Sequence, residues 1–467
     1  MKVIRKRMRL VALLISAAFV LIAAYFCYSV YLYGGRWIAN PYNPRIQSQK
    51  QQVIMGTVYD REGTKLAYTD DEGERTYNSN ENIRLAVSHA VGDSQGNVST
   101  GAETFFAQYL LGFKRSFLEK AALALSGESQ RGDDVTLTVS ASLSRYIREQ
   151  FPSGGKGAVV VLNYKTGEIL ALSSFPQFDP EDMDEAKANE ESVLVNRAIQ
   201  GLYPPGSTFK IVTLSSAIDN VADLDSFVFD CTGYYSVGSY SVTDASAHGR
   251  VDISDAFAHS CNTAFAFLSQ SLGYERLGAT AEAFGFNENF LFSDLIVYNS
   301  SYPVDNLSAE DLAWSAIGQG RVLATPMHMA LIASVIANRG ILKEPRLLKS
   351  IVTAEGRERT LPETAADREV ISVETAGRVE EEMIKVVKSG TGTRAAMDDG
   401  YVVAGKTGSA EVSDDKSVNA HAWFVGYITN RNAPYAIAVL VENGGSGGSV
   451  AAPLARRILT KCVNLGL

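Results

Sequence analysis

The sequence predicts an α+β protein in which an antiparallel sheet carries an inserted helical subdomain, preceded by one transmembrane helix and a small α+β domain. An uncharged apolar run lies near the N-terminus. Strand-like patterns occur near residue 160 and again after residue 400, and the region between them has helical periodicity. The length of 467 residues, 46% of them hydrophobic, is enough for about two or three domains.

The charge balance argues against a nucleic-acid-binding protein. The net charge is −9, and it is −14 without the five basic residues among the first nine positions, which include no acid. A surface of that sign cannot replace the counterions of phosphates. The four cysteines are too few for a disulfide framework, and neither they nor the five scattered histidines show metal-ligand spacing. The sequence therefore predicts no metal and no cofactor.

Residues Leu10–Tyr33 form a run of 24 residues without a charge. About 20 apolar residues span the hydrocarbon core of a bilayer, so this run fits a transmembrane helix with some tilt. A cleaved signal peptide is the alternative, but its apolar core is normally about 7–15 residues long and ends at small residues rather than tyrosines. The basic cluster before the run predicts a single-pass protein of the cell membrane, with residues 1–9 cytoplasmic and the body extracytoplasmic.

The rest of the chain is expected to form a stalk and two domains. Residues 34–52 are polar and contain proline, which is typical of a stalk. Residues 53–145 read as a small α+β domain with little that is chemically active. Its strand-like runs are Val53–Tyr59 and Val135–Val139, and its helical run is Thr104–Gly112. Residues 146–467 form the second domain.

The second domain is expected to begin with a β-hairpin and to end with three strands and a helix. The hairpin strands are Ala158–Leu162 and Glu168–Ser173. Apolar residues then recur at helical spacing in Ile211–Ile218, Ile253–Leu272 and Met327–Ile336. The later strands are Tyr401–Val412, Ala422–Ile428 and Tyr435–Glu442, and the last helical run is Ala451–Cys462. This order favours one sheet with a helical subdomain inserted into it.

The candidate nucleophile is Ser207, at the start of a predicted buried helix. A Pro-Pro-Gly turn precedes it, and Lys210 follows one helical turn later on the same face. Burial lowers the pKa of a lysine, so its amine can take a proton from the serine at neutral pH. The same Ser-x-x-Lys pattern occurs at Ser153–Lys156 and Ser413–Lys416, but there it lies in Gly-rich or acidic loops.

Two further short motifs complete the candidate site. Ser260 and Asn262 lie where one helical run passes into another, so that small polar side chains can project into a cleft; a helix cap is the plain alternative. Lys406–Gly408 lies in a strand-like segment with two glycines, which often mark the close approach of a ligand or a backbone. Second copies occur at Ser417–Asn419 and at Lys165–Gly167, the latter in the predicted hairpin turn.

The segment Gly400–Thr407 also matches the G-x-x-x-x-G-K-[ST] phosphate loop. A phosphate loop follows a strand and opens a helix, so that backbone amides surround the phosphates. Here Val402 and Val403 are strand formers, and the residues after Ser409 do not start a helix of that kind. A nucleotide site is therefore not expected.

Taken in order, the three motifs resemble the set found in penicillin-binding proteins and serine β-lactamases. The flanking segments resemble those of class B penicillin-binding proteins of the A/2 type, namely Asn196–Ala198, Tyr203–Lys210, Gly318–Gly320, Thr325–Pro326 and His421–Tyr427. The resemblance is strong over about 150–460 and looser over 53–140, where Gly56–Gly63 is similar to the start of the family's pedestal domain. Met55 stands where the family usually has arginine, and Ser409 stands where threonine is commoner.

The resemblance implies the penicilloyl-serine transferase (serine β-lactamase-like) fold. It also implies a D,D-transpeptidase that cross-links peptidoglycan stem peptides ending in D-Ala-D-Ala. Ser207 would attack the penultimate D-Ala carbonyl, and Lys210 would take its proton. The backbone amides of Ser207 and Ser409 would form the oxyanion hole. Ser260 would relay a proton to the leaving amine, and Asn262 would hold the substrate amide or Lys210.

The resemblance also assigns the substrate's terminal carboxylate to the third motif. Lys406, Thr407 and Ser409 would bind it, and Gly408 counts among the substrate-binding residues. An amine from a neighbouring stem peptide would then resolve the acyl-enzyme, whereas β-lactams would trap Ser207 because their acyl adduct leaves slowly.

Two other functions fit parts of the pattern. A β-lactamase-like hydrolase or D,D-carboxypeptidase needs a base for water. Class A β-lactamases carry that base in a Glu-x-x-Leu-Asn segment, which residues 263–405 lack. Class D enzymes resemble this chain in Ser-Thr-Phe-Lys and Trp-Phe-Val-Gly, but the anchor and the extra domain favour the transpeptidase. A non-catalytic scaffold or β-lactam sensor would usually lose the serine, a lysine or the Lys-Thr-Gly motif, and all are present.

The implied partners are peptidoglycan stem peptides, β-lactams and a membrane glycosyltransferase of the SEDS type. About 100 residues before the catalytic domain are too few for a glycosyltransferase domain, so a separate enzyme is expected to supply the glycan strand. Its contact is expected on the anchor and residues 34–140.

Overall fold

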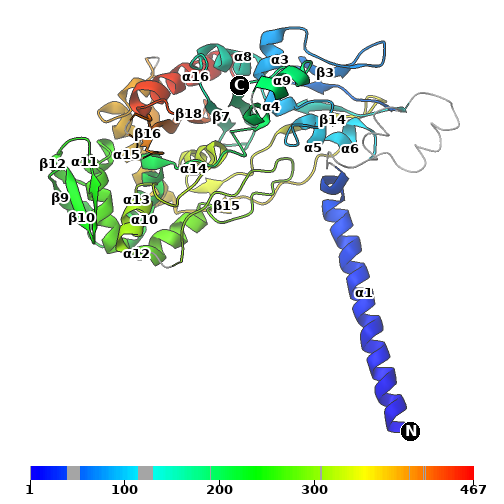
Figure 1. The fold of residues 1–467 in the computed structure, drawn as a ribbon, viewed down its shortest axis with the longest axis horizontal. Coiled ribbons are helices and arrows are strands. Elements are labelled where there is room, and N and C mark those ends of the chain that lie inside the picture. Colours follow the sequence, from blue (N-terminus) through cyan, green and yellow to red (C-terminus); the bar gives the residue numbers. More distant parts are fainter. Residues whose placement is uncertain are drawn as a thin grey trace.

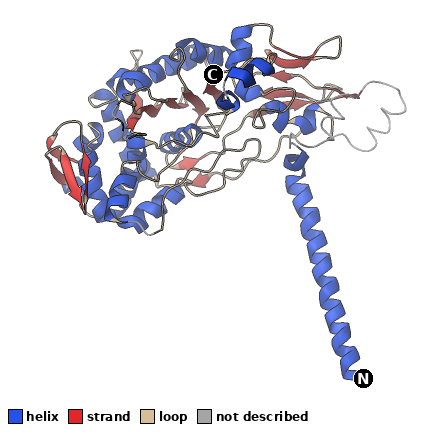
Figure 2. Cartoon of the chain, viewed as in Figure 1, coloured by secondary structure: helices blue, strands red, loops and turns tan. Residues whose placement is uncertain are grey.

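The computed structural model describes residues 2–38, 53–113, 130–189, 191–305, 308–398, 400–413, 415 and 417–467. A long helix projects from a body of sheets and helices (Figures 1 and 2). This helix, α1 (Lys2–Ile38), includes the stretch Ile4–Val30, which is long and apolar enough to cross a membrane. Of the predicted stalk, residues 39–52 lie outside the described residues.

The N-terminal region of the body contains a five-stranded sheet in the order β14-β6-β2-β3-β4. Its strands are β2 (Val58–Tyr59), β3 (Lys65–Thr69), β4 (Arg75–Tyr77), β6 (Asp134–Leu137) and β14 (Leu348–Val352). The same region contains the parallel pair β1 (Val53–Ile54) and β5 (Gln130–Arg131), and the helices α3 (Glu81–Ala86), α4 (Ser88–Val91), α5 (Ala102–Phe105) and α6 (Ala107–Leu110). Met55, at the position where the family usually has arginine, is buried in the hydrophobic core.

Strand β14 reaches this sheet from a distant part of the chain. It runs antiparallel to β6, with Leu348 opposite Leu137 and Val352 opposite Asp134. Arg359 Nε lies 2.6 Å from a carboxylate oxygen of the buried Asp133 nearby. The sequence analysis did not anticipate this strand, because no local pattern shows which sheet a short strand joins. The two parts of the body are therefore joined by strand pairing as well as by the chain connection.

The second domain is built on an antiparallel sheet in the order β16-β17-β18-β7-β8. Its strands are β7 (Gly157–Asn163), β8 (Ile169–Phe175), β16 (Val403–Ala410), β17 (His421–Ile428) and β18 (Tyr435–Val441). The predicted antiparallel sheet is confirmed. Along β7, Val160 and Leu162 face one core while Val159 and Val161 face the other. Burial on both faces explains why these strands read as continuous apolar runs.

Helices cover both faces of this sheet (Figure 1). Helix α14 packs on β7, β17 and β18, whereas α16 and α8 pack on the opposite face. The helices are α8 (Ala141–Gln150), α9 (Met183–Asn189), α10 (Lys210–Asn220), α11 (Ile253–Ala258), α12 (Asn262–Ala283), α13 (Ala309–Ala316), α14 (Pro326–Ala337), α15 (Val373–Lys388) and α16 (Ala452–Leu465). The inserted helical subdomain lies between β8 and β16, as the sequence predicts.

Small sheets interrupt the subdomain that was expected to be mostly helical. Strand β9 (Val228–Cys231) pairs with β12 (Gly249–Asp252), β10 (Tyr234–Val237) pairs with β11 (Tyr240–Thr243), and β13 (Ile341–Leu342) pairs with β15 (Arg368–Glu369). Gly233 and Gly238 adopt φ values of 95° and 56°, which turn the chain and end any helix. Two tyrosines and a valine between these glycines favour a strand.

Candidate active site

Ser207 lies in a tight turn at the start of a buried helix. The 3-10 helix η2 (Gly206–Phe209) continues directly into α10. Gly206 adopts φ 55°, and its N–H donates to the carbonyl of Gly318 at 2.9 Å. The Gly-Gln-Gly segment noted in the sequence therefore supports the turn that carries the serine. Ser207 is partly exposed, whereas Lys210 is completely buried.

Lys210 is held by the turn that contains Ser260 and Asn262. Its Nζ donates to the Ser260 carbonyl at 2.7 Å and to Asn262 Oδ1 at 2.8 Å. Burial lowers the pKa of Lys210 to about 7, although the negative charge of Asp244 opposes this shift. A neutral amine has two N–H donors and one lone pair. Because both donors have acceptors in this turn, the lone pair is left to take a proton.

Ser260 lies between two buried lysines. Its Oγ is 3.3 Å from Lys210 Nζ and accepts a hydrogen bond from Lys406 Nζ at 2.8 Å. Burial, and then the charge of Lys210, hold the pKa of Lys406 well below its ordinary value. Ser260 has φ 61°, a left-handed conformation that typically costs about 1–3 kcal/mol and that occurs where a site imposes it. The hydroxyl thus connects the two amines, a geometry suited to relaying a proton.

The third motif lies in β16, the edge strand of the sheet, which packs against η2. Thr407 Oγ1 is 2.6 Å from Thr391 Oγ1. Ser409 is exposed, and its Oγ accepts a hydrogen bond from the N–H of Gly447 at 3.2 Å. Lys406 is inside a strand, and the described residues just after β16 (411–413, 415 and 417–420) form no helix. This segment is therefore not a phosphate loop.

Gly408 lies where β16 packs against the turn that carries Ser207. A Cβ atom at this position would lie 3.0 Å from the Pro205 carbonyl oxygen and 3.1 Å from Thr208 Cγ2. In the neighbouring strand, Trp423 Nε1 donates to the Pro204 carbonyl at 3.1 Å and fixes the same approach. The backbone of the third motif is thus held against the segment that carries Ser207.

Replacing Gly408 with alanine is expected to slow β-lactam acylation by about 10- to 100-fold, because the added methyl group pushes β16 away from Ser207 and a shift of about 1 Å can cost about 100-fold. Gly377→Ala in α15 is the matched control, since a Cβ there meets nothing within 4 Å. Acylation kinetics with a fluorescent penicillin measure both variants. Equal rates for Gly408→Ala and the unmodified chain would contradict the close approach.

Asp244 is a supporting residue that the sequence analysis missed. It follows β11, and its carboxylate accepts hydrogen bonds from the N–H groups of Asn262 and Thr263 at 2.6 and 3.1 Å and from Thr263 Oγ1 at 2.6 Å. Burial opposes ionisation of Asp244, but these hydrogen bonds outweigh it and keep its pKa below the ordinary value. The carboxylate therefore fixes the first turn of α12, from which Asn262 reaches Lys210. A lone aspartate between two short strands gives no sequence signal of this role.

A second set of supporting residues holds the segment that leads into the Ser207 turn. Glu442 Oε1 accepts hydrogen bonds from Tyr203 Oη at 2.7 Å and from Arg197 Nε at 2.8 Å. These contacts fasten the segment before Ser207 to the end of β18. Arg197 and Tyr203 belong to the flanks that carried the family resemblance, so the structure supplies a physical reason for their presence there.

The second copies of the motifs lie away from this site. Lys165–Gly167 forms the turn between β7 and β8, with Gly167 at φ 78°. Ser153–Lys156 lies in the loop after α8, and Ser417–Asn419 lies in the loop after β16. In the remaining copy, Ser413–Lys416, the lysine lies outside the described residues.

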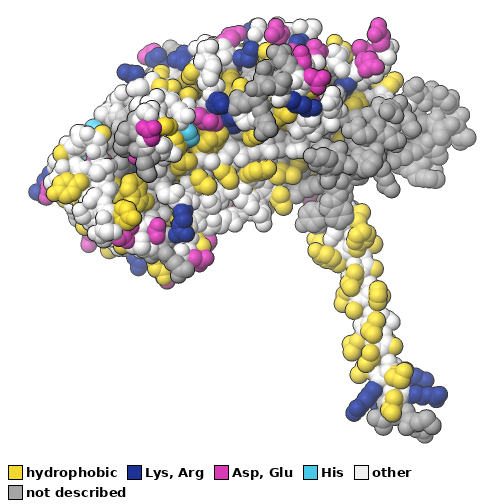
Figure 3. All heavy atoms as spheres, in the orientation of Figure 1, with side chains coloured by type: hydrophobic (Ala, Val, Ile, Leu, Met, Phe, Trp, Pro, Cys, Tyr) yellow, Lys and Arg dark blue, Asp and Glu magenta, His cyan; other side chains and the backbone are white. Residues whose placement is uncertain are grey.

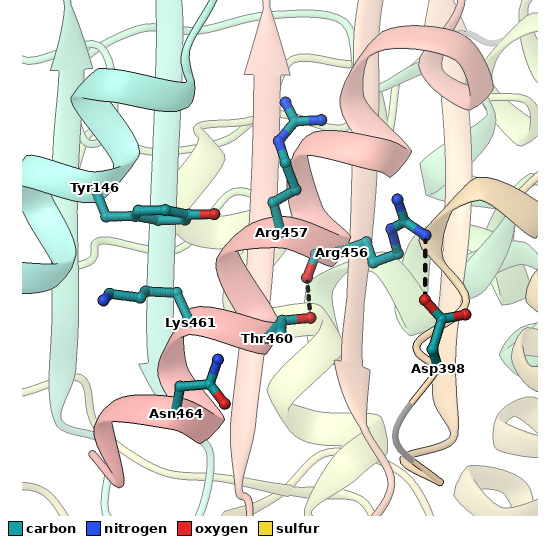
Figure 4. A pocket seen from close by; sticks show the side chains of 7 residues that line it. All are labelled: Tyr146, Asp398, Arg456, Arg457, Thr460, Lys461 and Asn464. Atoms are coloured by element: carbon teal, nitrogen blue, oxygen red, sulfur yellow. Dashed lines mark hydrogen bonds and ion pairs between the residues drawn. The ribbon is translucent and has the colours of Figure 1, made fainter.

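A cavity of about 440 Å³ lies along the outer face of α16, on the other side of the sheet from α14 (Figure 4). Arg456 is 3.8 Å from Asp398 there, and Lys461 Nζ lies 5.4 Å from the ring centroid of Tyr146. None of the seven lining residues belongs to the three motifs. The cavity is therefore distinct from the Ser207 site.

Comparison with known families and structures agrees with the geometry. The family model described as the penicillin binding protein transpeptidase domain matches residues 157–460. The peptidoglycan D,D-transpeptidase PbpA of Mycolicibacterium smegmatis is 30% identical over 405 residues, which cover 80% of this chain and 81% of that protein. The peptidoglycan D,D-transpeptidase MrdA of Haemophilus influenzae is 30% identical over 71% of this chain and 56% of its own length.

Solved structures show the same similarity. Penicillin-binding protein A of Mycobacterium tuberculosis, in its ceftriaxone acyl-enzyme complex, has a TM-score of 0.80 and 29% identity. The similarity covers 88% of this chain and 99% of that chain. PBP2 of Pseudomonas aeruginosa in complex with WCK 5153 has a TM-score of 0.73 and 26% identity over 88% of this chain and 96% of that one.

Proposed function

The chain belongs to the penicillin-binding protein transpeptidase family, and we propose that its acyl-enzyme forms on Ser207. The protein is a serine-type peptidoglycan D,D-transpeptidase and a target of β-lactams. The observation that supports the assignment to Ser207 is the convergence of two buried lysines on Ser260 beside the nucleophile turn. The other Ser-x-x-Lys serine described with its lysine, Ser153, lies in a loop away from these groups.

In the acylation step, Ser207 Oγ attacks the carbonyl of the penultimate D-Ala and Lys210 Nζ takes the hydroxyl proton. The peptide bond to the terminal D-Ala breaks, and its nitrogen leaves as an amine. The proton that this nitrogen needs passes from Lys210 through the hydroxyl of Ser260, which lies 3.3 Å from Lys210 Nζ. Asn262 orients Lys210 throughout, because its Oδ1 accepts one of the amine's hydrogen bonds.

The backbone N–H groups of Ser207 and Ser409 are assigned to the oxyanion hole. There they stabilise the negative charge that develops on the attacked carbonyl oxygen. Removing one such donor from an oxyanion hole typically costs about 2.7–4 kcal/mol. Strand β16 is at the edge of its sheet, so one side of it has no neighbour among the described strands and can face a substrate. The position of Gly408 against Pro205 supports a common site for both donors.

The third motif is assigned to bind the substrate's terminal carboxylate. Ser409 is exposed, and Thr407 lies two residues earlier on the same face of the strand, so their hydroxyls can donate to a carboxylate oxygen. Lys406 is fully buried and bonded to Ser260, and it contributes to this end of the site mainly through Ser260 and through its charge when protonated. A neighbouring stem peptide's amine then attacks the acyl-enzyme, and Ser207 regains its proton.

Intact mass of the full chain after mixing with benzylpenicillin tests this assignment against the alternatives. A stable one-to-one adduct is expected, because the opened penicillin stays attached to Ser207 and blocks the approach of an acceptor. Rapid loss of the adduct with free penicilloate accumulating would mean a hydrolase. A folded protein that forms no adduct at any penicillin concentration would mean a non-catalytic scaffold.

We further propose that α1 anchors the body outside the cell membrane. Apolar side chains cover most of α1, and lysine and arginine side chains gather at its free end (Figure 3). Positive charge next to a span favours the cytoplasmic side. We expect protease added to cells stripped of their wall to digest the body, and deletion of residues 2–38 to release it from membranes. A body that stays protected until the membrane is dissolved would contradict this orientation.

A SEDS-type membrane glycosyltransferase is the proposed partner, contacting α1 and the N-terminal region. Deleting residues 53–140 would be a poor test, because β14 would lose its neighbour β6. Exchanging α1 for an unrelated transmembrane helix keeps the body intact. We expect this exchange to reduce co-purification of the glycosyltransferase, and unchanged co-purification would count against contact through the anchor.

A further inference from the structure

The hairpin formed by β10 and β11 borders the active site on the side of Asn262. Thr243 is the last residue of β11, and its carbonyl accepts a hydrogen bond from Asn262 Nδ2 at 3.1 Å. Asn262 Oδ1 is the atom that accepts from Lys210 Nζ, so a single amide group connects the hairpin to the catalytic lysine. Strand β10 lies at the end of the body far from α1 (Figure 1).

One face of this hairpin is exposed and carries only hydroxyl side chains. This hydroxyl face consists of Tyr234, Ser236, Ser241 and Thr243. Tyr234 lies opposite Thr243 in the antiparallel register, and the two serines lie opposite each other, so all four side chains project to the same side. All four residues are exposed, and Tyr234 is 61% exposed. None of these side chains is charged, so the face suits a peptide or another neutral polar ligand rather than an ion.

The opposite face of the hairpin is packed against the helical subdomain. Val237 and Val242 are buried in the main hydrophobic core. The ring of Tyr235 lies 5.8 Å from the ring of Phe267 in α12 and 6.1 Å from that of Phe229, measured between centroids. This packing holds the hydroxyl face in a fixed position beside the site. A side chain held in place in this way loses little conformational entropy when it binds a ligand.

The part of the substrate that precedes D-Ala-D-Ala has to pass this region. The substrate's terminal carboxylate is assigned to Thr407 and Ser409 in β16, and its scissile carbonyl to Ser207. The rest of the peptide therefore runs from Ser207 towards the opposite wall, where Asn262 lies. One N–H of the Asn262 amide donates to the Thr243 carbonyl, and the second can donate to a carbonyl of the substrate. Beyond this contact the peptide meets the hydroxyl face.

We propose that the hydroxyl face of the β10–β11 hairpin binds the part of the donor stem peptide that precedes D-Ala-D-Ala. This subsite rests on the proposed acylation of Ser207 and adds substrate selectivity to it. The exposed ring of Tyr234 packs against apolar parts of the peptide, and the serine and threonine hydroxyls form hydrogen bonds with its amide groups. The hairpin thus favours a whole stem peptide over a short D-Ala-D-Ala analogue.

Consumption of two peptides by the full chain, purified in detergent, tests this subsite. One peptide is a stem pentapeptide ending in D-Ala-D-Ala, and the other is acetyl-D-Ala-D-Ala, which is too short to reach the hairpin. For Tyr234→Ala, the ratio of kcat/KM for the pentapeptide to kcat/KM for the short peptide is expected to fall by about 10-fold, the scale of one lost aromatic contact. The fall should come mainly from a higher KM for the pentapeptide. Tyr234→Phe keeps the ring and should restore most of the ratio.

Tyr274→Ala is the matched control, because Tyr274 is an exposed tyrosine of α12 outside the hydroxyl face. It should leave the ratio unchanged. A ratio that stays constant in Tyr234→Ala, or that falls equally in Tyr274→Ala, would overturn the proposal. Equal losses on both peptides in Tyr234→Ala would show that the hairpin acts only by supporting Asn262, and would also overturn it.

Two further outcomes have distinct meanings. If Tyr234→Ala abolished self-association of the chain without changing the ratio, the hydroxyl face would bind a second copy rather than substrate, and the proposal would be wrong. An unmodified chain that consumes neither peptide would contradict the proposed function itself, on which the subsite depends.

Discussion

Ser207→Ala is expected to form no covalent adduct with benzylpenicillin under conditions that label the unmodified chain completely. The adduct of the unmodified chain should have the mass of protein plus the whole penicillin, because opening the lactam ring expels no group. Without the Ser207 hydroxyl, the two buried lysines and Ser260 remain but there is no nucleophile beside Lys210. Intact mass spectrometry measures the adduct, and peptide mapping locates it.

Ser153→Ala is the matched control for this variant. It removes the serine of another Ser-x-x-Lys segment, in an exposed loop after α8. We expect full labelling of this variant at the rate of the unmodified chain. Labelling that persists in Ser207→Ala, or that disappears in Ser153→Ala, would move the nucleophile away from the site described here.

Lys210→Ala is expected to slow acylation by about 100- to 10,000-fold, the usual contribution of a positioned general base. Lys210→Arg should be impaired to a similar extent. Arginine keeps a positive charge and several donors for the Ser260 carbonyl and Asn262 Oδ1, but it cannot give up its proton at any accessible pH. Lys156→Ala, in the exposed loop, is the control and should acylate normally. An arginine variant with near-normal rates would show that Lys210 acts through its charge rather than as a base.

The pH dependence of acylation provides an independent check of the same role. Only the unprotonated amine can accept the Ser207 proton, and burial lowers the pKa of Lys210 to about 7. The rate constant should therefore rise as pH increases through about 7 and level off above it. A profile that is flat from pH 5 to 9, or that falls over this range, would contradict the assigned protonation state.

The local patterns of the sequence were sufficient for the long apolar N-terminal helix, the hairpin and the three later strands. Each of these elements buries or exposes its residues in a regular way, as the apolar runs of β7 and β18 illustrate. The small sheets between residues 228 and 252 were missed, because glycine turns and short polar strands carry little periodic signal. Strand β14 was missed as a member of the N-terminal sheet, since its partner β6 is more than 200 residues away in the sequence.

The candidate site shows the same division between what local patterns reveal and what depends on the fold. The motif residues could be chosen among several copies because their flanks predicted a buried helix, a helix junction and a glycine-containing strand. The contact of Lys406 with Ser260 joins segments that are 146 positions apart, and no spacing rule gives it. Asp244 likewise reaches the N–H of Asn262 only through the folding of strands β9 to β12.

The most direct test of the whole account is whether an amine resolves the acyl-enzyme on Ser207. The full chain would be incubated with a stem pentapeptide ending in D-Ala-D-Ala and isotope-labelled D-Ala as acceptor, and the products measured by mass spectrometry. We predict that labelled D-Ala replaces the terminal residue in excess over hydrolysis, and that Ser207→Ala forms neither product. Hydrolysed tetrapeptide alone, with no exchange at any acceptor concentration, would contradict the transpeptidase.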